Sequence, residues 1–293
     1  MIPVERAREW IEAGQSVGAR HVLATPRGLA AGASGGHLGT GLGSSIEFLD
    51  HREYQPGDDL RHVDWSASAR GDRLVVKLFR EEVTPWLDLV IDGSRSMALP
   101  GTAKAEAAIA LSALLAEAGM AAGFRHAAWR ASDGCERLDA GALSPESFAG
   151  DVFRGTCGMA QALAHRPPRL RPRSIRLVVS DLLFPDDPAA VLDRLAPGAA
   201  LVAMIQIVAR ADLDPPEEGM LRLHDVETGE ELEVSMDAAA ARGYRAALEA
   251  HRRQWHDATR ARAVPLVSLC AEDLLARWEL HPVVAAGILA PGT

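Results

Sequence analysis

Cysteine is scarce in this chain of 293 residues, and its spacing excludes two common kinds of stabilised site. The three cysteines, Cys135, Cys157 and Cys270, form no Cys-x-x-Cys pair, so neither a structural zinc site nor a disulfide framework is indicated. Cys157 has no adjacent base to activate it, and we expect a small packing residue there. Aromatic residues make up only 5% of the chain, so aliphatic residues and alanine must fill the core.

The chain also lacks long apolar runs and an excess of basic residues. The most apolar run, 199–209, is about half the length needed to span a bilayer. The first ten residues are charged and contain no apolar signal core. A formal net charge of -9 argues against general binding of nucleic acid. These features predict a soluble, cytoplasmic protein.

Familiar catalytic motifs are missing as well. The sequence has no Gly-x-Ser-x-Gly elbow and no His-Glu-x-x-His pair, and the glycine-rich stretch 39–43 lacks the Gly-Lys-Ser/Thr ending of a phosphate loop. The histidines are scattered, and we expect His251 and His256 on the solvated face of a helix. We therefore expect no enzymatic activity. The alternative is a metal-assisted hydrolase or phosphoryl-transfer enzyme, with Asp92 as its nucleophile.

Strands and helices alternate from residue 87 onward. This order predicts an α/β fold, namely a doubly wound and mostly parallel sheet with helices on both faces. We expect a hairpin over 221–234 that turns at Thr228-Gly229. The other expected elements are strands at 74–79, 87–91, 177–179, 201–208 and 264–269, and helices at 4–14, 103–120, 237–262 and 272–279.

The most informative motif is D-x-S-x-S, formed by Asp92, Ser94 and Ser96. It directly follows the apolar strand 87–91, and ligands of open α/β sheets bind at such carboxyl ends. Its side chains offer only oxygen, which suits a hard cation such as Mg²⁺ better than zinc. Arg95 adds a cation here, which lowers metal affinity unless it points away or pairs with an acid. The alternative is that the hydroxyls cap the next helix and the acid closes a turn.

Two later residues extend this motif. Asp181 ends a second apolar strand, and Thr156 stands between the two strands just before a short helical stretch. The order D-x-S-x-S, Thr, Asp resembles the metal-ion-dependent adhesion site of von Willebrand factor A domains. That resemblance implies that Ser94, Ser96 and Thr156 bind Mg²⁺ or Mn²⁺ directly, while Asp92 and Asp181 often act through water.

A second segment, residues 52–70, reads REYQPGDDLRHVDWSASAR. It resembles the signature of the bacterial domain-of-unknown-function 58 family, and the resemblance extends over roughly residues 27–280. It implies a family-specific segment over 1–83 and a von Willebrand factor A-like domain over 84–293. Such proteins are commonly paired with MoxR-type AAA+ ATPases, so the resemblance implies a non-enzymatic, metal-dependent adaptor. Its partners would be the ATPase and a client protein, bound through an acidic side chain at the metal. A metal site that is purely structural, in a scaffold protein, is a further alternative.

The signature segment has two interpretations of its own. Its alternating acids and arginines suggest an ion-paired knot beside the core, with Trp65 burying its large apolar surface. On that interpretation Trp65→Ala costs about 3–5 kcal/mol if the ring is fully buried. The other interpretation is a docking surface.

Five arginines crowd the segment 166–176, just before the strand that ends at Asp181. Its prolines make much of the segment extended. One interpretation is a solvated loop. The other is a docking strip for an acidic protein surface, such as one on the ATPase, at the end of the sheet opposite the proposed metal site.

Overall fold

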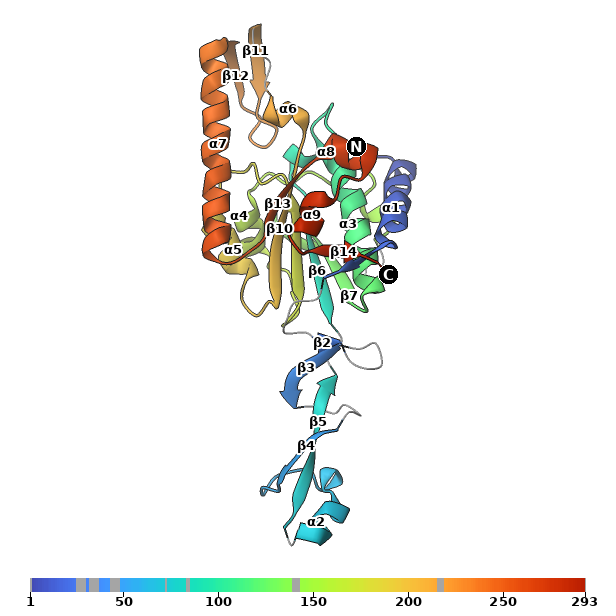
Figure 1. The fold of residues 1–293 in the computed structure, drawn as a ribbon. Helices are drawn as coiled ribbons and strands as arrows, with labels where there is room; N and C mark the ends of the chain where they lie inside the picture. Colours follow the sequence, from blue (N-terminus) through green and yellow to red (C-terminus); the bar gives the residue numbers. More distant parts are fainter. Residues whose placement is uncertain are drawn as a thin grey trace. The chain divides into compact units, whose positions relative to one another are not determined.

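The computed structural model describes residues 2–24, 30–31, 37–42, 48–71, 73–82, 85–138, 143–214 and 219–292 (Figure 1). The chain forms two compact units, one made of residues 1–24 and 86–293 and the other of residues 25–85. We predicted a single N-terminal segment over 1–83. Residues 1–24 instead belong to the larger unit, because their helix α1 (Val4–Gly18) packs against the helix α3 (Lys104–Ala121) of that unit.

The larger unit is built on a six-stranded sheet with the order β13-β10-β9-β6-β7-β8. All neighbouring pairs are parallel except β7 with β8. The predicted α/β class with a mostly parallel sheet is thus confirmed. The strands are β6 (Trp86–Asp92), β7 (Arg125–Ala131), β8 (Cys135–Arg137), β9 (Ile175–Ser180), β10 (Leu201–Val208) and β13 (Leu266–Cys270).

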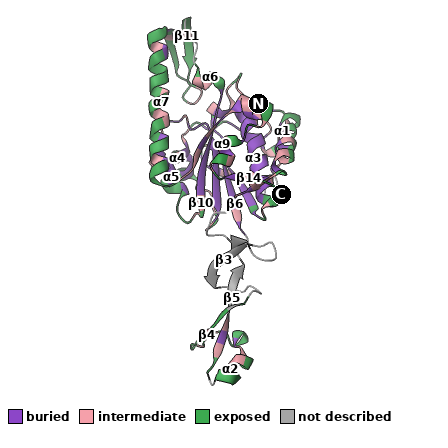
Figure 2. Cartoon of the chain, viewed as in Figure 1, coloured by how far each residue is buried: buried purple, intermediate pink, exposed green. Residues whose placement is uncertain are grey.

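Helices cover both faces of this sheet, which explains why its central strands are mostly apolar and are buried along nearly their whole length. All six residues of β9 are buried, and so are all residues of β10 after its first, Leu201 (Figure 2). Alternate residues along a strand face opposite sides, so Leu89 and Val90 of β6 belong to different hydrophobic clusters. One face carries α1 (Val4–Gly18), α3 (Lys104–Ala121) and α8 (Ala271–Arg277), and the other carries α4 (Met159–His165), α5 (Pro188–Leu195) and α7 (Ala238–Ala261).

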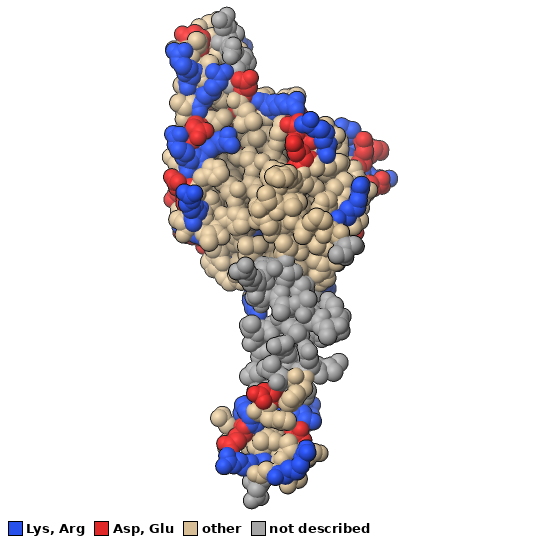
Figure 3. All heavy atoms as spheres, viewed as in Figure 1, with Lys and Arg blue, Asp and Glu red and all other residues tan. Residues whose placement is uncertain are grey.

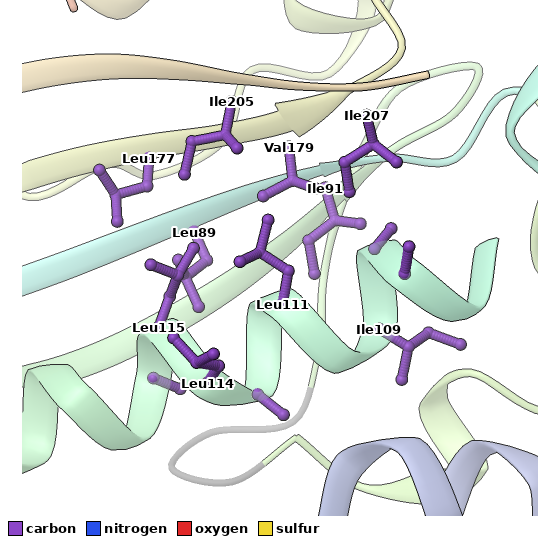
Figure 4. Packing of buried hydrophobic residues seen from close by; sticks show 14 of the residues in the cluster. Leu89, Ile91, Ile109, Leu111, Leu114, Leu115, Leu177, Val179, Ile205 and Ile207 are labelled. Carbon is purple, nitrogen blue, oxygen red and sulfur yellow. The ribbon is translucent and has the colours of Figure 1, made fainter. Parts of the chain in front are cut away.

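The alanine-rich helix α3 is the centre of the first face. Figure 4 shows its Leu111 and Leu115 side chains on the side of the helix that faces the aliphatic side chains of β6, β9 and β10. Its small residues also let α1 approach closely. A Cβ added at Gly14 of α1 would lie 2.1 Å from the carbonyl oxygen of Ala110, so only glycine fits there. In a chain with few aromatic residues, alanine and glycine thus fill the core by letting the helices pack closely against each other.

The long helix α7 begins with a cap, because the Asp237 carboxylate accepts the N–H groups of Ala239 and Ala240. Arginines and acidic residues alternate along its outer surface (Figure 3). We expected both of its histidines to be solvated. His256 is exposed, whereas His251 is half-buried, with Nε2 2.6 Å from the carbonyl oxygen of Leu182.

The predicted hairpin is present as β11 (Gly219–His224) and β12 (Glu231–Met236). Its turn is ordered by Asp225, whose carboxylate accepts the N–H groups of Glu227 and Thr228, and by Gly229 at a φ of 78°. The larger unit also contains β1 (His21–Leu23) paired with β14 (Leu289–Pro291), α6 (Arg210–Leu213), α9 (His281–Ala285), and the 3₁₀ turns η2 (Arg95–Ala98) and η3 (Pro145–Ser147).

The smaller unit contains the signature segment and pairs several of its charges. Arg52 bonds Asp58 at 2.6 Å and Arg61 bonds Asp59 at 2.7 Å, so the predicted ion pairs are present. The expected burial of Trp65 is wrong, because 65% of this residue is exposed. Its elements are β2 (Ala30–Ala31), β3 (His37–Leu42), β4 (Phe48–Glu53), η1 (Leu60–His62), α2 (Trp65–Gly71) and β5 (Val75–Glu82).

Among the residues that the structure describes, no helix has the length and apolar character needed to cross a membrane.

Candidate metal site

The strand order places two acidic strand ends side by side. From β6 the chain proceeds to β7 and β8 on one side, and from β9 to β10 and β13 on the other. The order therefore reverses between β6 and β9, which are hydrogen-bonded neighbours. Ligands of open α/β sheets bind outside the carboxyl ends of strands at such a reversal. Asp92 is the last residue of β6, and Asp181 directly follows β9.

Asp92 is buried at this edge, with both carboxylate oxygens engaged. Oδ1 accepts the N–H of Ser94 at 2.9 Å, and Oδ2 accepts the hydroxyl of Ser180 at 2.5 Å. Burial, followed by the negative charge of Asp181, raises the pKa of Asp92 to about 6. In the part of the chain that the structure describes, no Lys, Arg or His side chain pairs with this carboxylate. A divalent cation would supply the missing charge and favour the ionised form.

Ser94 and Ser96 supply hydroxyls beside this carboxylate. They lie at the start of η2, and their Oγ atoms are 2.9 Å apart. This distance allows a hydrogen bond between them. It also equals the spacing of neighbouring ligands around octahedral Mg²⁺, about 3 Å for metal–oxygen bonds of about 2.1 Å. The donor chemistry and the spacing at this point therefore fit Mg²⁺.

Asp181 is already paired with a lysine that sequence reasoning missed. The Lys104 ammonium lies 2.9 Å from Oδ2 of Asp181 and 3.2 Å from a carboxylate oxygen of Asp212. Burial alone would lower the pKa of Lys104, but the charges of the two aspartates outweigh it and the pKa is raised. Oδ1 of Asp181 accepts the N–H of Leu183. Asp181 thus acts on Asp92 chiefly through its charge.

The hydroxyl of Thr156 has a hydrogen-bond partner outside the predicted set. The neighbouring backbone does reach the motif, since the N–H of Arg95 donates to the carbonyl of Gly155 at 3.1 Å. The Thr156 hydroxyl, however, donates to Oδ1 of Asp133 at 3.2 Å, and its N–H donates to the same oxygen at 2.8 Å. Of the five predicted residues, the structure gathers Asp92, Ser94, Ser96 and Asp181 and directs the Thr156 hydroxyl to Asp133.

Cys157, the residue after Thr156, is half-buried, and burial raises the pKa of its thiol to about 11.

A second missed residue, Glu227, comes from the hairpin turn. Arg95 of the motif donates to the carbonyl of Val226 at 3.1 Å, which ties the turn to the site across 131 positions of sequence. Glu227 is half-buried. Its pKa is raised by burial and by the charge of Asp181, against the lowering effect of a hydrogen bond from Ser96. A third carboxylate therefore faces the Ser96 side of the site. The turn residues were noticed in the sequence, but nothing local linked them to the motif.

The oxygen donors here differ from those of a carboxylate-rich metal centre. Within the described ranges, no group of three or more His, Cys, Asp or Glu residues is arranged to hold a metal ion. A cation at this edge would therefore depend on serine hydroxyls together with Asp92. Such a site needs few protein ligands, and Mg²⁺ commonly retains several waters.

Comparison with known families matches residues 50–254 to the family described as "Protein of unknown function DUF58". The chain belongs to this family. It is 30% identical over 259 residues to uncharacterized proteins of Mycobacterium bovis and Mycobacterium tuberculosis. Each match covers 80% of this chain and 78% of the relative.

Two solved structures are more distantly similar to this chain. One is the conserved hypothetical protein BatB from Bacteroides thetaiotaomicron, with 10% identity, a TM-score of 0.38 and coverage of 69% of this chain and 98% of that one. The other is an aerotolerance-related membrane protein from Bacteroides fragilis, with 12% identity, a TM-score of 0.36 and coverage of 69% and 99%.

Proposed function

We propose that this DUF58 protein is a metal-dependent protein-binding adaptor whose larger unit is a von Willebrand factor A-like domain. The observation that carries the proposal is the meeting of Asp92, Ser94 and Ser96 at the reversal point of the sheet. Every donor there is oxygen, and no cation among the described residues pairs with the buried carboxylate. Mg²⁺, or Mn²⁺ in its place, would be held by these side chains.

The metal would supply a fixed positive charge that accepts a carboxylate from a partner protein. Metal coordination selects an acidic side chain and fixes its geometry, which gives specificity through one residue. Asp181 would add negative charge next to the metal without offering a free oxygen, because Lys104 and Leu183 already occupy its two oxygens.

Glu227 would act as the built-in carboxylate of this site. It faces Ser96 from the hairpin turn, and Arg95 holds the turn through the carbonyl of Val226. In the absence of a partner, Glu227 would take the place that the partner's acid takes later. The hairpin turn would then have to move away from the metal before the partner's acid could bind there.

The partners proposed are a MoxR-type AAA+ ATPase and its client protein, with the acidic side chain supplied by one of them. This part of the proposal rests on the family resemblance of residues 52–70 and on membership of the DUF58 family. Capture of the ATPase from the native host, with and without Mg²⁺, tests it. Capture that is the same in Mg²⁺ and in a chelator would contradict a metal-dependent contact.

Calorimetry with Mg²⁺ and Mn²⁺ tests the metal site itself. We expect Asp92→Ala to abolish binding, whereas Ser94→Ala weakens it less, because water can replace one hydroxyl. Thr156→Val should change the affinity less than Ser94→Ala, since its hydroxyl serves Asp133. The exposed Asp151 provides a control, and Asp151→Ala should bind like the parent. Equal binding by Asp92→Ala and the parent would refute the site.

The enzymatic alternative is separated from the adaptor by a second measurement. Parent protein is incubated with generic phosphate and ester substrates, with and without Mg²⁺. The adaptor proposal expects no turnover under either condition. Metal-dependent turnover that Asp92→Ala removes would favour the hydrolase or phosphoryl-transfer interpretation instead.

A further inference from the structure

A cleft of about 1000 Å³ opens in the larger unit, away from the candidate metal site. One wall comes from β6, β7 and β8, and the other comes from the arginine-rich segment 166–171. Trp86, the first residue of β6, lines it, whereas Asp92 at the candidate metal site is the last residue of the same strand. The cleft is therefore a separate feature at the other end of β6.

The arginine-rich segment is fastened to the sheet by a buried acid. Asp88 of β6 is fully buried, and its two oxygens accept the Nε1–H of Trp129 at 3.2 Å and the N–H of Arg171 at 2.9 Å. The buried guanidinium of Arg176 in β9 also donates to the carbonyl of Arg171 at 3.1 Å. A solvated loop would not need these anchors. The segment is a fixed wall of the cleft.

Two arginines pack against the ring of Trp86, which lines the cleft. The guanidinium carbon of Arg171 lies 4.8 Å from the centre of the Trp86 ring, and that of Arg125 lies 5.3 Å from it. These distances are typical of cation–π contacts. Of these two arginines, Arg171 lines the cleft, and stacking positions its guanidinium while leaving its N–H groups for an anionic ligand.

The charge lining the cleft is mostly positive. Arg137 and Arg169 are exposed, and within the described part of the chain neither forms an ion pair. The one acid at the rim, Glu136, is already bonded to Arg130 and Arg166. The other acid, Asp88, has both oxygens occupied. This excess of positive charge stands out in a chain with a net charge of -9.

We propose that this cleft binds an acidic, extended segment of a partner protein. The volume lies at the upper end of the range for ligand pockets, about 300–1,000 Å³, and exceeds what a single phosphate requires. Guanidiniums bind carboxylates through paired hydrogen bonds, and Arg137 and Arg169 are available for this. β8 borders the cleft, but the N–H of Cys135 already donates to the carbonyl of Arg166 at 2.9 Å, so the arginine side chains and not strand pairing would hold the segment.

Nucleic acid fits this cleft less well. Single-stranded nucleic acid is held by bases that stack on open aromatic faces. The Trp86 ring already contacts two guanidiniums, and the indole of Trp129 is tied to Asp88. The net charge of -9 would also repel a long polyanion outside the cleft. The proposal does not depend on the metal site, and the two can fail separately.

Fluorescence anisotropy with a labelled peptide of repeating Glu-Glu-Leu tests the proposal. The double variant Arg137→Glu with Arg169→Glu should weaken binding about tenfold or more, because both guanidiniums become repulsive. Arg8→Glu with Arg194→Glu makes the same charge change at exposed arginines outside the cleft, and it should retain binding within about twofold. Circular dichroism verifies that both variants are folded.

Three results would overturn the proposal. The first is undetectable binding of the peptide by the parent. The second is an equal loss in the two double variants, which would mean that only overall charge matters. The third is stronger binding of a labelled oligothymidine than of the peptide, which would assign the cleft to nucleic acid. Asp92→Ala serves as a further control, because loss of the metal site should leave peptide affinity unchanged.

Discussion

The ammonium of Lys104 lies 2.9 Å from Oδ2 of Asp181, and both side chains are fully buried. The pair joins the first turn of α3 to the carboxyl end of β9, which are 77 positions apart in sequence. Asp212 is a second partner of the same ammonium at 3.2 Å. Lys104 thus holds two acids together behind the candidate metal site and limits the negative charge that accumulates there.

Removing the Lys104 ammonium should destabilise the protein strongly. Lys104→Met keeps most of the side-chain volume but leaves Asp181 buried without its counter-charge, which typically costs about 3–5 kcal/mol. Denaturant unfolding monitored by circular dichroism measures the free energy of unfolding. As a control, Arg6→Met breaks the exposed Arg6–Glu9 pair and should have little effect. A Lys104→Met protein as stable as the parent would show that the buried pair is not needed.

Without divalent metal, stability should fall as the pH rises toward 6. The ordinary pKa of Asp92, 3.8, is raised to about 6 in the folded state. The folded protein therefore holds this proton more tightly than the unfolded chain. The stabilising effect is complete below about pH 4 and is lost as the pH rises through about 6. The free energy of unfolding should fall by about 3 kcal/mol in total, because the pKa of Asp92 differs by about two between the folded and unfolded states.

Unfolding in a chelator at pH 4.5, 5.5, 6.5 and 7.5 measures this loss. Asp92→Asn cannot ionise, so the difference between parent and variant isolates this carboxyl from other titrating groups. Saturating Mg²⁺ should remove the loss in the parent, because the cation favours the ionised form. A difference that does not change with pH would mean that the pKa of Asp92 is not raised.

Glu227 should couple the hairpin turn to the metal. If its carboxylate completes the site, Mg²⁺ should slow amide hydrogen exchange at residues 225–229, because the turn is then held more often in place. Glu227→Ala should abolish this slowing and lower Mg²⁺ affinity a few-fold. The exposed Glu230 of the same turn is the matched control, and Glu230→Ala should behave like the parent. Slowing that persists in Glu227→Ala would exclude a role for this carboxylate.

Trp65→Ala should barely change the stability of the smaller unit. The ring is mostly exposed, and substitutions of exposed side chains usually change the free energy of unfolding by about 0.5 kcal/mol or less. Val76 of the same unit is only 4% exposed, so Val76→Ala should cost clearly more. Thermal unfolding of both variants makes the comparison. A large loss for Trp65→Ala would restore the interpretation of this residue as part of a core.

Local patterns predicted the elements of the larger unit closely. The apolar run 201–208 coincides with β10, and the expected helix over 103–120 is α3, Lys104–Ala121. These predictions work because periodicity and capping act over a few neighbouring residues. The oxygen-only chemistry of Asp92, Ser94 and Ser96 is likewise local, since the strand before it and the loop after it are encoded side by side.

Only the tertiary structure decided which distant side chains meet. The Lys104–Asp181 pair, the approach of Glu227 to Ser96 and the bond from Thr156 to Asp133 each join residues at least 23 positions apart. No local pattern encodes such contacts, because they depend on strand order and on how helices cover the sheet. The exposure of Trp65 has the same origin. The sequence alone determined that oxygen-bearing side chains gather at the end of β6. The packing of distant elements decided which charged residues surround them.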